Sequence, residues 1–195
     1  EEASKYIQKV PQVFFKLKII QKAFTKCFFG ELGTKNSYKK IINDFKVSRY
    51  NFFLINYLLK KKEIHEIQDL IEKESETFED RLLLKHSKLI FYQEDYKKLK
   101  KYFNCQNPNH LISEFFYFIA NLYSLENDYV LSNFYLKLSY FMNNDFYLNR
   151  DLLAENYYYS KKYDLAKKIY FSLRKEGEIY SWRSNRRIAH IKSIT

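Results

Sequence analysis

Residues 152–170 read LLAENYYYSKKYDLAKKIY, and the same pattern occurs 34 positions earlier in the chain. Leu-Ala-x-x-Tyr at 153–157 repeats Ile-Ala-x-x-Tyr at 119–123, and Tyr163 follows Tyr129 at the same interval. A period near 34 residues that carries small and aromatic residues at fixed places is typical of stacked helix–turn–helix repeats. Such arrays bind partners on extended surfaces and seldom catalyse reactions.

Two further series of landmarks extend the repeat toward both ends. A residue that follows each expected turn recurs at intervals of 32, 33 and 34, at Ile64, Tyr96, Tyr129 and Tyr163. A small residue recurs at intervals of 33, 34 and 35, at Ser87, Ala120, Ala154 and Ala189. Small side chains let the two helices of a hairpin approach closely. Ser132 and Ala166 are expected to be the equivalent small residues on the second helix of each hairpin.

The composition predicts an all-α protein. The 195 residues include only three glycines and two prolines, whereas sheet proteins need frequent turn residues. The three glycines also form no phosphate-binding loop. The expected helices are 3–29, 36–45, 52–60, 64–73, 79–92, 96–103, 111–125, 129–142, 148–160, 163–174 and 181–193.

The net charge of +11 permits two interpretations. A basic chain suits an acidic partner such as nucleic acid or an anionic membrane surface. Alternatively, the abundance of Lys, Asn, Ile, Phe and Tyr reflects the base composition of an AT-rich genome. Because the lysines are spread along the chain, the second interpretation is favoured.

Cys27 and Cys105 are the only cysteines, and their spacing matches no metal or redox motif. The sequence predicts two buried thiols rather than a disulfide. No apolar run reaches the roughly 20 residues that a membrane-spanning helix needs. The chain begins at Glu1, which is compatible with a removed signal peptide or a trimmed fragment, so the compartment, cytoplasmic or periplasmic, stays open.

These residues resemble the tetratricopeptide repeat (TPR) family, and in particular bacterial TPR proteins of AT-rich genomes. The copy at 147–180 is the best, that at 113–146 is good, and those at 80–112 and 48–79 are weaker. The chain lacks the usual first-helix glycine and the repeat-end proline. The resemblance implies one continuous right-handed α-solenoid over 47–195, closed by a final helix at 181–193. Residues 1–46 would form an N-terminal hairpin, either a cap or a degenerate repeat.

The resemblance also implies a concave face lined by the first helix of each pair. The residues expected to bind a partner there are Tyr117, Phe118, Asn121, Asp151, Glu155, Tyr158, Tyr159, Arg183, Arg186, Arg187 and His190. Some TPR proteins clamp a terminal carboxylate with Asn, Lys and Arg on this face. Asn121, Arg183 and Arg187 match that pattern, whereas Tyr117 and Leu152 depart from it.

Three of the seven arginines lie within five residues on the last expected helix. A guanidinium fork suits a carboxylate or phosphate of a ligand. The alternative is that Arg183 and Arg187 pair with Asp151 and Glu155, one repeat away, and this alternative is favoured.

The functional prediction is a non-catalytic scaffold that binds a peptide or a partner helix on the concave face. The alternative is a basic helical-repeat RNA-binding protein or ribonucleoprotein subunit. The four histidines are scattered and form no metal or nucleophile motif, so the sequence predicts no catalytic site, no cofactor and no metal site.

Overall fold

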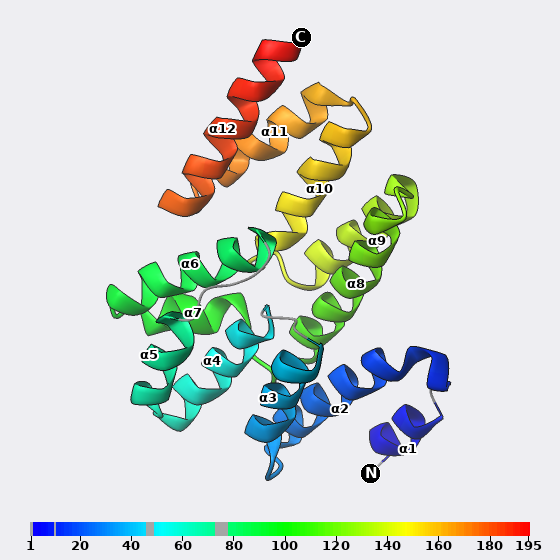
Figure 1. Ribbon diagram of the computed structural model, residues 1–195, viewed down its shortest axis with the longest axis vertical. Helices are drawn as coiled ribbons and strands as arrows, with labels where there is room; N and C mark the ends of the chain where they lie inside the picture. The colour runs from blue at the N-terminus through cyan, green and yellow to red at the C-terminus, as the bar shows by residue number, and fades with distance from the viewer. Residues whose placement is uncertain (1, 10, 46–48, 73–77) are drawn as a thin grey trace. The chain divides into compact units, whose positions relative to one another are not determined.

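The computed structural model describes residues 2–9, 11–45, 49–72 and 78–195, and within these ranges it contains helices and no strand (Figure 1). The all-α prediction is therefore confirmed. The helices are α1 (Glu2–Gln8), α2 (Phe15–Phe29), α3 (Thr34–Phe45), α4 (Tyr50–Lys61), α5 (Ile64–Glu72), α6 (Phe78–Tyr92), α7 (Tyr96–Tyr102), α8 (Pro108–Leu125), α9 (Tyr129–Met142), α10 (Leu148–Tyr159), α11 (Tyr163–Leu173) and α12 (Glu178–Ile194), with a 3-10 turn at Gln12–Phe14. The predicted boundary at 46/47 and the predicted helix end at Lys73 lie outside the described residues.

One expected helix is wrong. The single helix predicted for 3–29 is divided into α1 and α2, with the 3-10 turn between them. Pro11 precedes that turn with extended backbone, φ −57° and ψ 151°. Proline has no amide hydrogen to donate and disfavours helical backbone before it, which explains the break.

The helices are joined in pairs by turns that share one backbone geometry. Each turn has a residue of positive φ, with φ between 56° and 68°, at Gly30, Lys62, Glu94, Asn127 and Lys161. Each of these residues donates its amide to the carbonyl three residues earlier, as Lys62 does to Leu59. The next residue donates to the carbonyl five residues earlier, as Glu63 does to Leu58. This is the Schellman arrangement, which satisfies the last carbonyls of a helix.

The five turns recur at intervals of 32, 32, 33 and 34 residues. They define the hairpins α2–α3, α4–α5, α6–α7, α8–α9 and α10–α11, which α12 follows. The structure thus gives the N-terminal hairpin the same turn as the others. The sequence pattern did not reveal this shared turn, because the turns differ in length. Helix α3 begins four residues after Gly30, whereas α5 begins two residues after Lys62.

The small landmarks are buried where the helices meet, with one exception. Ala120, Ala154 and Ala166 have no exposed surface, and the hydroxyl of Ser132 donates to the Ala120 carbonyl at 2.8 Å. Ala189 is exposed instead, because Ile188 and Ile191 take the inner positions of α12. The prediction that Ala189 is an equivalent small packing residue is therefore wrong.

The chain divides into two compact units, residues 1–108 and 109–195. The division falls at Asn107-Pro108-Asn109, where the sequence has its strongest helix breaker. An aromatic cluster fills the core of the first unit, with the rings of Phe24 and Phe53 5.2 Å apart and those of Phe53 and Phe103 4.5 Å apart. Such edge-to-face contacts add to the stabilisation that burial provides.

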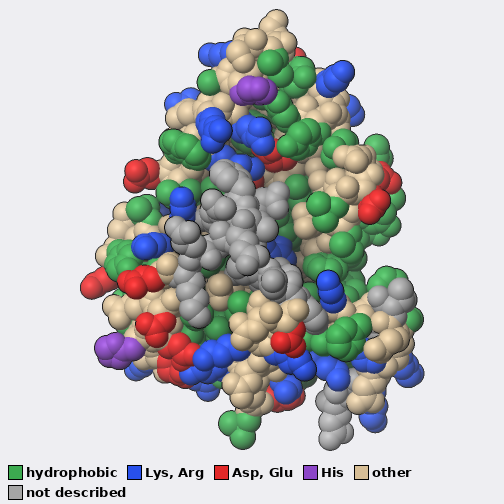
Figure 2. All heavy atoms as spheres, in the orientation of Figure 1, with side chains coloured by type: hydrophobic (Ala, Val, Ile, Leu, Met, Phe, Trp, Pro, Cys, Tyr) green, Lys and Arg blue, Asp and Glu red, His purple; other side chains and the backbone are tan. Residues whose placement is uncertain are grey.

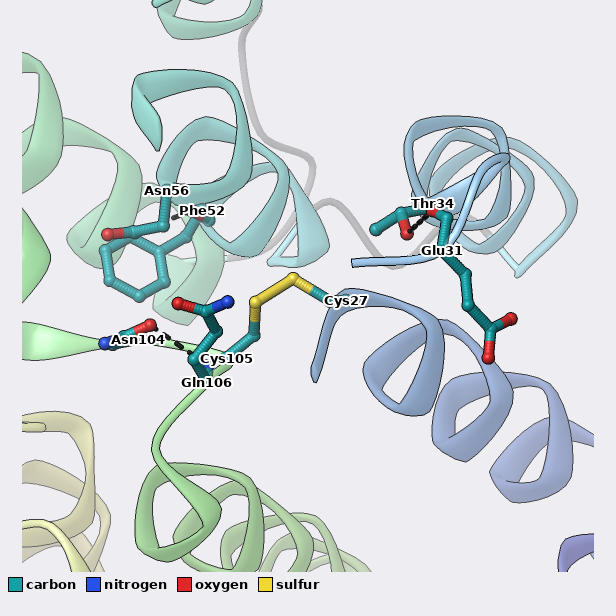
Figure 3. The surroundings of a disulfide bond; sticks show 8 residues. All are labelled: Cys27, Glu31, Thr34, Phe52, Asn56, Asn104, Cys105 and Gln106. Atoms are coloured by element: carbon teal, nitrogen blue, oxygen red, sulfur yellow. Dashed lines mark hydrogen bonds between the residues drawn. A yellow bond between two sulfur atoms is a disulfide. The ribbon is translucent and has the colours of Figure 1, made fainter. Parts of the chain in front are cut away.

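A disulfide joins Cys27 to Cys105 within the first unit, and the prediction of two free thiols is wrong (Figure 3). The two cysteines are 78 positions apart in sequence but their Cα atoms are 5.8 Å apart, within the range that a disulfide spans. The bond ties the C-terminal turn of α2 to the segment between α7 and α8. Only the tertiary packing of the first unit brings these positions together.

Candidate partner-binding surface

A buried network of opposite charges links α10 to α12 in the second unit. Arg183 Nε lies 2.6 Å from Asp151 Oδ1, and both side chains are almost fully buried. Arg183 Nη2 also lies 3.4 Å from Glu155 Oε1. Arg187 binds the same carboxylate through two nitrogens, with Nε 2.8 Å from Oε1. The pairing that the sequence favoured for these four residues is confirmed.

The network is completed by Tyr170 of α11, whose hydroxyl donates to Glu155. Burial and the charge of Glu155 raise the pKa of Tyr170 above its ordinary value, so the hydroxyl stays protonated and remains a donor. Burial opposes the charge on Arg183, but the charge and hydrogen bond of Asp151 together with the charge of Glu155 raise the pKa of Arg183. Two carboxylates therefore face two guanidinium groups, and their hydrogen bonds are used inside the protein rather than toward a partner.

Exposed side chains lie along the neighbouring face of α12. Trp182, Arg186 and His190 are spaced four residues apart, which places them on one stripe of a helix. Trp182 is 55% exposed, and the guanidinium of Arg186 lies 5.6 Å from the centre of its ring. We call these three residues the α12 stripe. Figure 2 shows histidine, basic and hydrophobic side chains together in the part of the surface formed by the second unit.

Tyr158 of α10 contacts the α12 stripe, and its sequence neighbour Tyr159 packs against Tyr158. The hydroxyl of Tyr158 is 2.9 Å from His190 Nδ1, and the guanidinium of Arg187 lies 5.1 Å from the Tyr158 ring centre. Tyr159 is 56% exposed and stacks on Tyr129 at 6.3 Å. Tyr158 is thus held by a histidine and by an arginine that is itself fixed by Glu155.

The other predicted contact residues lie elsewhere. Tyr117 is buried and packs edge to face against Phe146, so its predicted place on an exposed face is wrong. Asp151, Glu155 and Arg183 are likewise buried, and a partner cannot reach them in this conformation. Phe118 and Asn121 are half-buried on α8 rather than on the helices that carry the stripe.

Trp182 was not among the contact residues expected from the sequence. The signal that identifies it is the i, i+4, i+8 spacing with Arg186 and His190, which becomes informative once the exposed face of α12 is known.

Among the described residues, no group of three or more His, Cys, Asp or Glu side chains is arranged to hold a metal ion. In the same ranges, no helix has the length and apolar character required to cross a membrane. No family model matches this chain, and no curated protein and no solved structure is significantly similar to it.

Proposed function

We propose that this chain is a TPR-like α-solenoid that acts as a non-catalytic scaffold and binds a peptide segment or partner helix of another protein. The five hairpin turns share the Schellman hydrogen-bond pattern and recur at intervals of 32 to 34 residues, which supports the repeat architecture. The observation that carries the function is the α12 stripe: an exposed tryptophan, arginine and histidine backed by a fixed network of buried charges.

The chemistry of the stripe suits an interface anchor. Tryptophan and arginine are the residue types that most often dominate binding energy, because their large side chains lose water over a wide area. Trp182, Tyr158 and Tyr159 offer aromatic surface, while Arg186 and His190 offer polar groups that orient a partner. The sequence analysis included Arg183 and Arg187 among the contacts. Their ion pairs with Asp151 and Glu155 instead hold α12 against α10.

Site-directed photocrosslinking tests the proposal. A photoreactive phenylalanine analogue is placed at Trp182 or Tyr159, and a control analogue is placed at the exposed Lys168 of α11. In lysate of the source cell, we expect the first two positions to give one shared protein adduct that survives nuclease treatment. The same adduct should be absent from position 168. Equal labelling at all three positions, or no protein adduct at positions 159 and 182, contradicts the proposal.

The net charge of +11 favours nucleic acid as the second candidate partner. In that case the captured material is sensitive to nuclease, and its affinity falls steeply with salt. Replacing Arg186 with alanine would then reduce the slope of affinity against salt by about one, since one phosphate contact is lost. For a protein partner, the same substitution weakens binding without that change of slope.

A further inference from the structure

Helix α9 of the second unit is apolar on the side that is exposed as well as on the side that is buried. Its buried side contains Ser132, Leu136 and Ser139, and the two serines bond to α8 while Asn156 of α10 bonds to Ser132 (Figure 1). On the other side, Phe141 is 82% exposed. We call this side the α9 face, and it consists of Val130, Leu131, Phe134, Leu138 and Phe141.

The corresponding positions of the other hairpins carry charged residues. The turn intervals of 33 and 34 residues align Phe134 with Lys101 of α7 and Lys168 of α11, both of which are exposed. Exposed charged residues align with Val130 in the same way, namely Lys97 and Asp164. A helix side that meets water normally carries polar residues. The apolar α9 face therefore indicates that another surface covers it.

The residues of the α9 face have the spacing of a coiled-coil contact. Leu131, Phe134, Leu138 and Phe141 follow one another at steps of three, four and three, which is the spacing of the a and d positions of a heptad. Lys137 is the only charged residue of α9 and lies at the edge of this face. A helix that packs on the α9 face therefore buries apolar side chains and leaves the ammonium group in water.

A second copy of α9 fits this face in the antiparallel direction. With the two-fold axis at residue 136, Leu131 of one copy meets Phe141 of the other, because their numbers are symmetric about that residue. By the same symmetry, Phe134 meets Leu138. Each layer then combines one ring with one smaller leucine, so the space between the helices is filled evenly. Parallel pairing would instead place ring against ring and leucine against leucine, in layers of unequal width.

The size of the α9 face suits a weak dimer. Its five side chains expose roughly 500 Å², because an aromatic side chain alone contributes about 150–250 Å² when it is fully accessible. Such a patch is at the upper end of what monomeric proteins leave open. Two copies that cover each other would bury roughly 1,000 Å² in total, which is at the low end of specific interfaces.

We propose that this chain forms a two-fold symmetric homodimer in which α9 packs antiparallel to α9 of a second copy. The interface does not depend on the function proposed for the α12 stripe, which lies on a different helix. A dimer carries two such stripes, so it binds a partner with two matching segments more tightly than a monomer does.

Sedimentation equilibrium of the intact, oxidised chain between about 1 and 300 µM tests the proposal. We expect a reversible dimer with a Kd of roughly 10–100 µM. Phe134→Lys and Phe141→Lys should each weaken the dimer at least about tenfold, because an ammonium group is costly to bury in an apolar contact. Phe171→Lys is the matched control, since Phe171 of α11 is 46% exposed and lies outside the α9 face. This control should leave the Kd unchanged, and circular dichroism of every variant checks that the fold is retained.

Mixing variants tests the antiparallel register. Leu138→Glu alone should also weaken the dimer, but its mixture with Phe134→Lys should form a heterodimer at least about fivefold tighter than either variant alone. The two introduced charges then meet in one layer, while the other layer keeps its natural ring and leucine. A mixture of Leu138→Glu with Phe141→Lys should not recover, because these positions face different layers.

Salt separates a second copy from other occupants. Each copy carries a net charge of +11, so raising the salt concentration should tighten the dimer by screening the repulsion, whereas binding of an acidic partner would weaken. The proposal is overturned by a monomer at 300 µM, by Phe134→Lys and Phe141→Lys dimerising like the natural chain, or by Phe171→Lys weakening the dimer as much as they do. Failure of the Leu138→Glu and Phe134→Lys mixture to recover overturns the antiparallel pairing.

Discussion

At the scale of single residues, the arginines of α12 divide into two groups with opposite roles. Arg183 is buried against Asp151, whereas Arg186 is exposed beside Trp182. Removing one partner of a buried ion pair leaves the other charge without compensation in a medium that solvates it poorly. The sequence neighbourhood of these residues is the same, so their difference comes from the helix periodicity of α12.

We therefore expect Arg183→Ala to lower the free energy of unfolding of the second unit by about 3–5 kcal/mol. Arg186→Ala should change it by less than about 0.5 kcal/mol, as for most surface substitutions. Trp182 is the only tryptophan, so its fluorescence during urea titration reports on α12 directly. Equal and small effects of the two substitutions would contradict a stabilising role for the buried pair.

A second residue-scale prediction concerns the ion cluster between α3 and α5. The ammonium of Lys35 bonds to Glu63 and Glu66, and Lys39 lies 2.5 Å from Glu66. The hydrogen bonds from Lys35 and then Lys39 lower the pKa of Glu66 below its ordinary 4.5. Because the folded-state pKa is the lower one, the cluster stabilises the fold above pH 4.5, and this contribution is lost as pH falls through the folded-state pKa.

Glu66→Gln should accordingly be less stable than the natural chain at pH 7 by about 0.5 kcal/mol, a typical value for a solvent-accessible ion pair. The difference should be smaller at pH 3, because the carboxylate of Glu66 becomes increasingly protonated as the pH falls through its lowered pKa. Urea unfolding followed by circular dichroism at both pH values gives the comparison. A difference that persists unchanged at pH 3 would show that Glu66 acts through packing rather than charge.

At the scale of elements, the hairpin turns combine a repeated geometry with unusual residue choices. Four of the five turns place a non-glycine residue in the left-handed region, among them Lys161 with φ 58° and Asn127 with φ 61°. A side chain with a Cβ atom is disfavoured there, although asparagine tolerates it better than lysine does. The repeat is thus built on turns that are under local backbone strain.

Lys161→Gly should raise the free energy of unfolding by about 0.5–1 kcal/mol, because the relief of strain exceeds the added entropy of the unfolded chain. Asn127→Gly should have a smaller effect, since asparagine has less strain to lose. Thermal melts of both variants alongside the natural chain measure the two changes. A loss of stability in Lys161→Gly would mean that its side chain contributes more than its backbone conformation costs.

The same turns explain how far the sequence predicts the elements. The landmarks Ile64, Tyr96, Tyr129 and Tyr163 each lie two residues after a left-handed residue, so their intervals reproduced those of the turns. Residues 129–142 form a helix with the predicted limits because strong turn signals flank both ends. The sequence analysis expected an N-terminal hairpin but left open whether it is a cap or a degenerate repeat, because the turn between α2 and α3 is four residues long and carries no such landmark.

The site was predicted in the same uneven way. Arg183 and Asp151 are 32 residues apart, close to one repeat, and their pairing followed from that spacing. The exposure of the side chains could not be predicted from that spacing. Tyr117, for example, is buried against Phe146, and this depends on how α8 packs against later segments. Local periodicity therefore predicts helices and turns, whereas contacts between them need the assembled unit.

At the scale of the whole molecule, the disulfide is the strongest long-range constraint on the first unit. Cys27 and Cys105 enclose most of residues 1–108, and a loop of this length loses much conformational entropy when it is closed in the unfolded chain. The second unit contains no cysteine, so its stability is expected to be independent of redox conditions. The two units should therefore respond differently to a reductant.

We expect reduction, or the double substitution Cys27→Ser with Cys105→Ser, to lower the free energy of unfolding of the first unit by about 2–4 kcal/mol. Trp182 lies in the second unit, so its fluorescence should show an almost unchanged transition while circular dichroism shows an earlier one. Because both cysteines are held in the disulfide, the protein isolated under thiol-blocking conditions should carry no alkyl group on either of them. Two alkylated cysteines, together with coincident transitions before and after reduction, would show that the thiols are free and that the bond contributes nothing to the first unit.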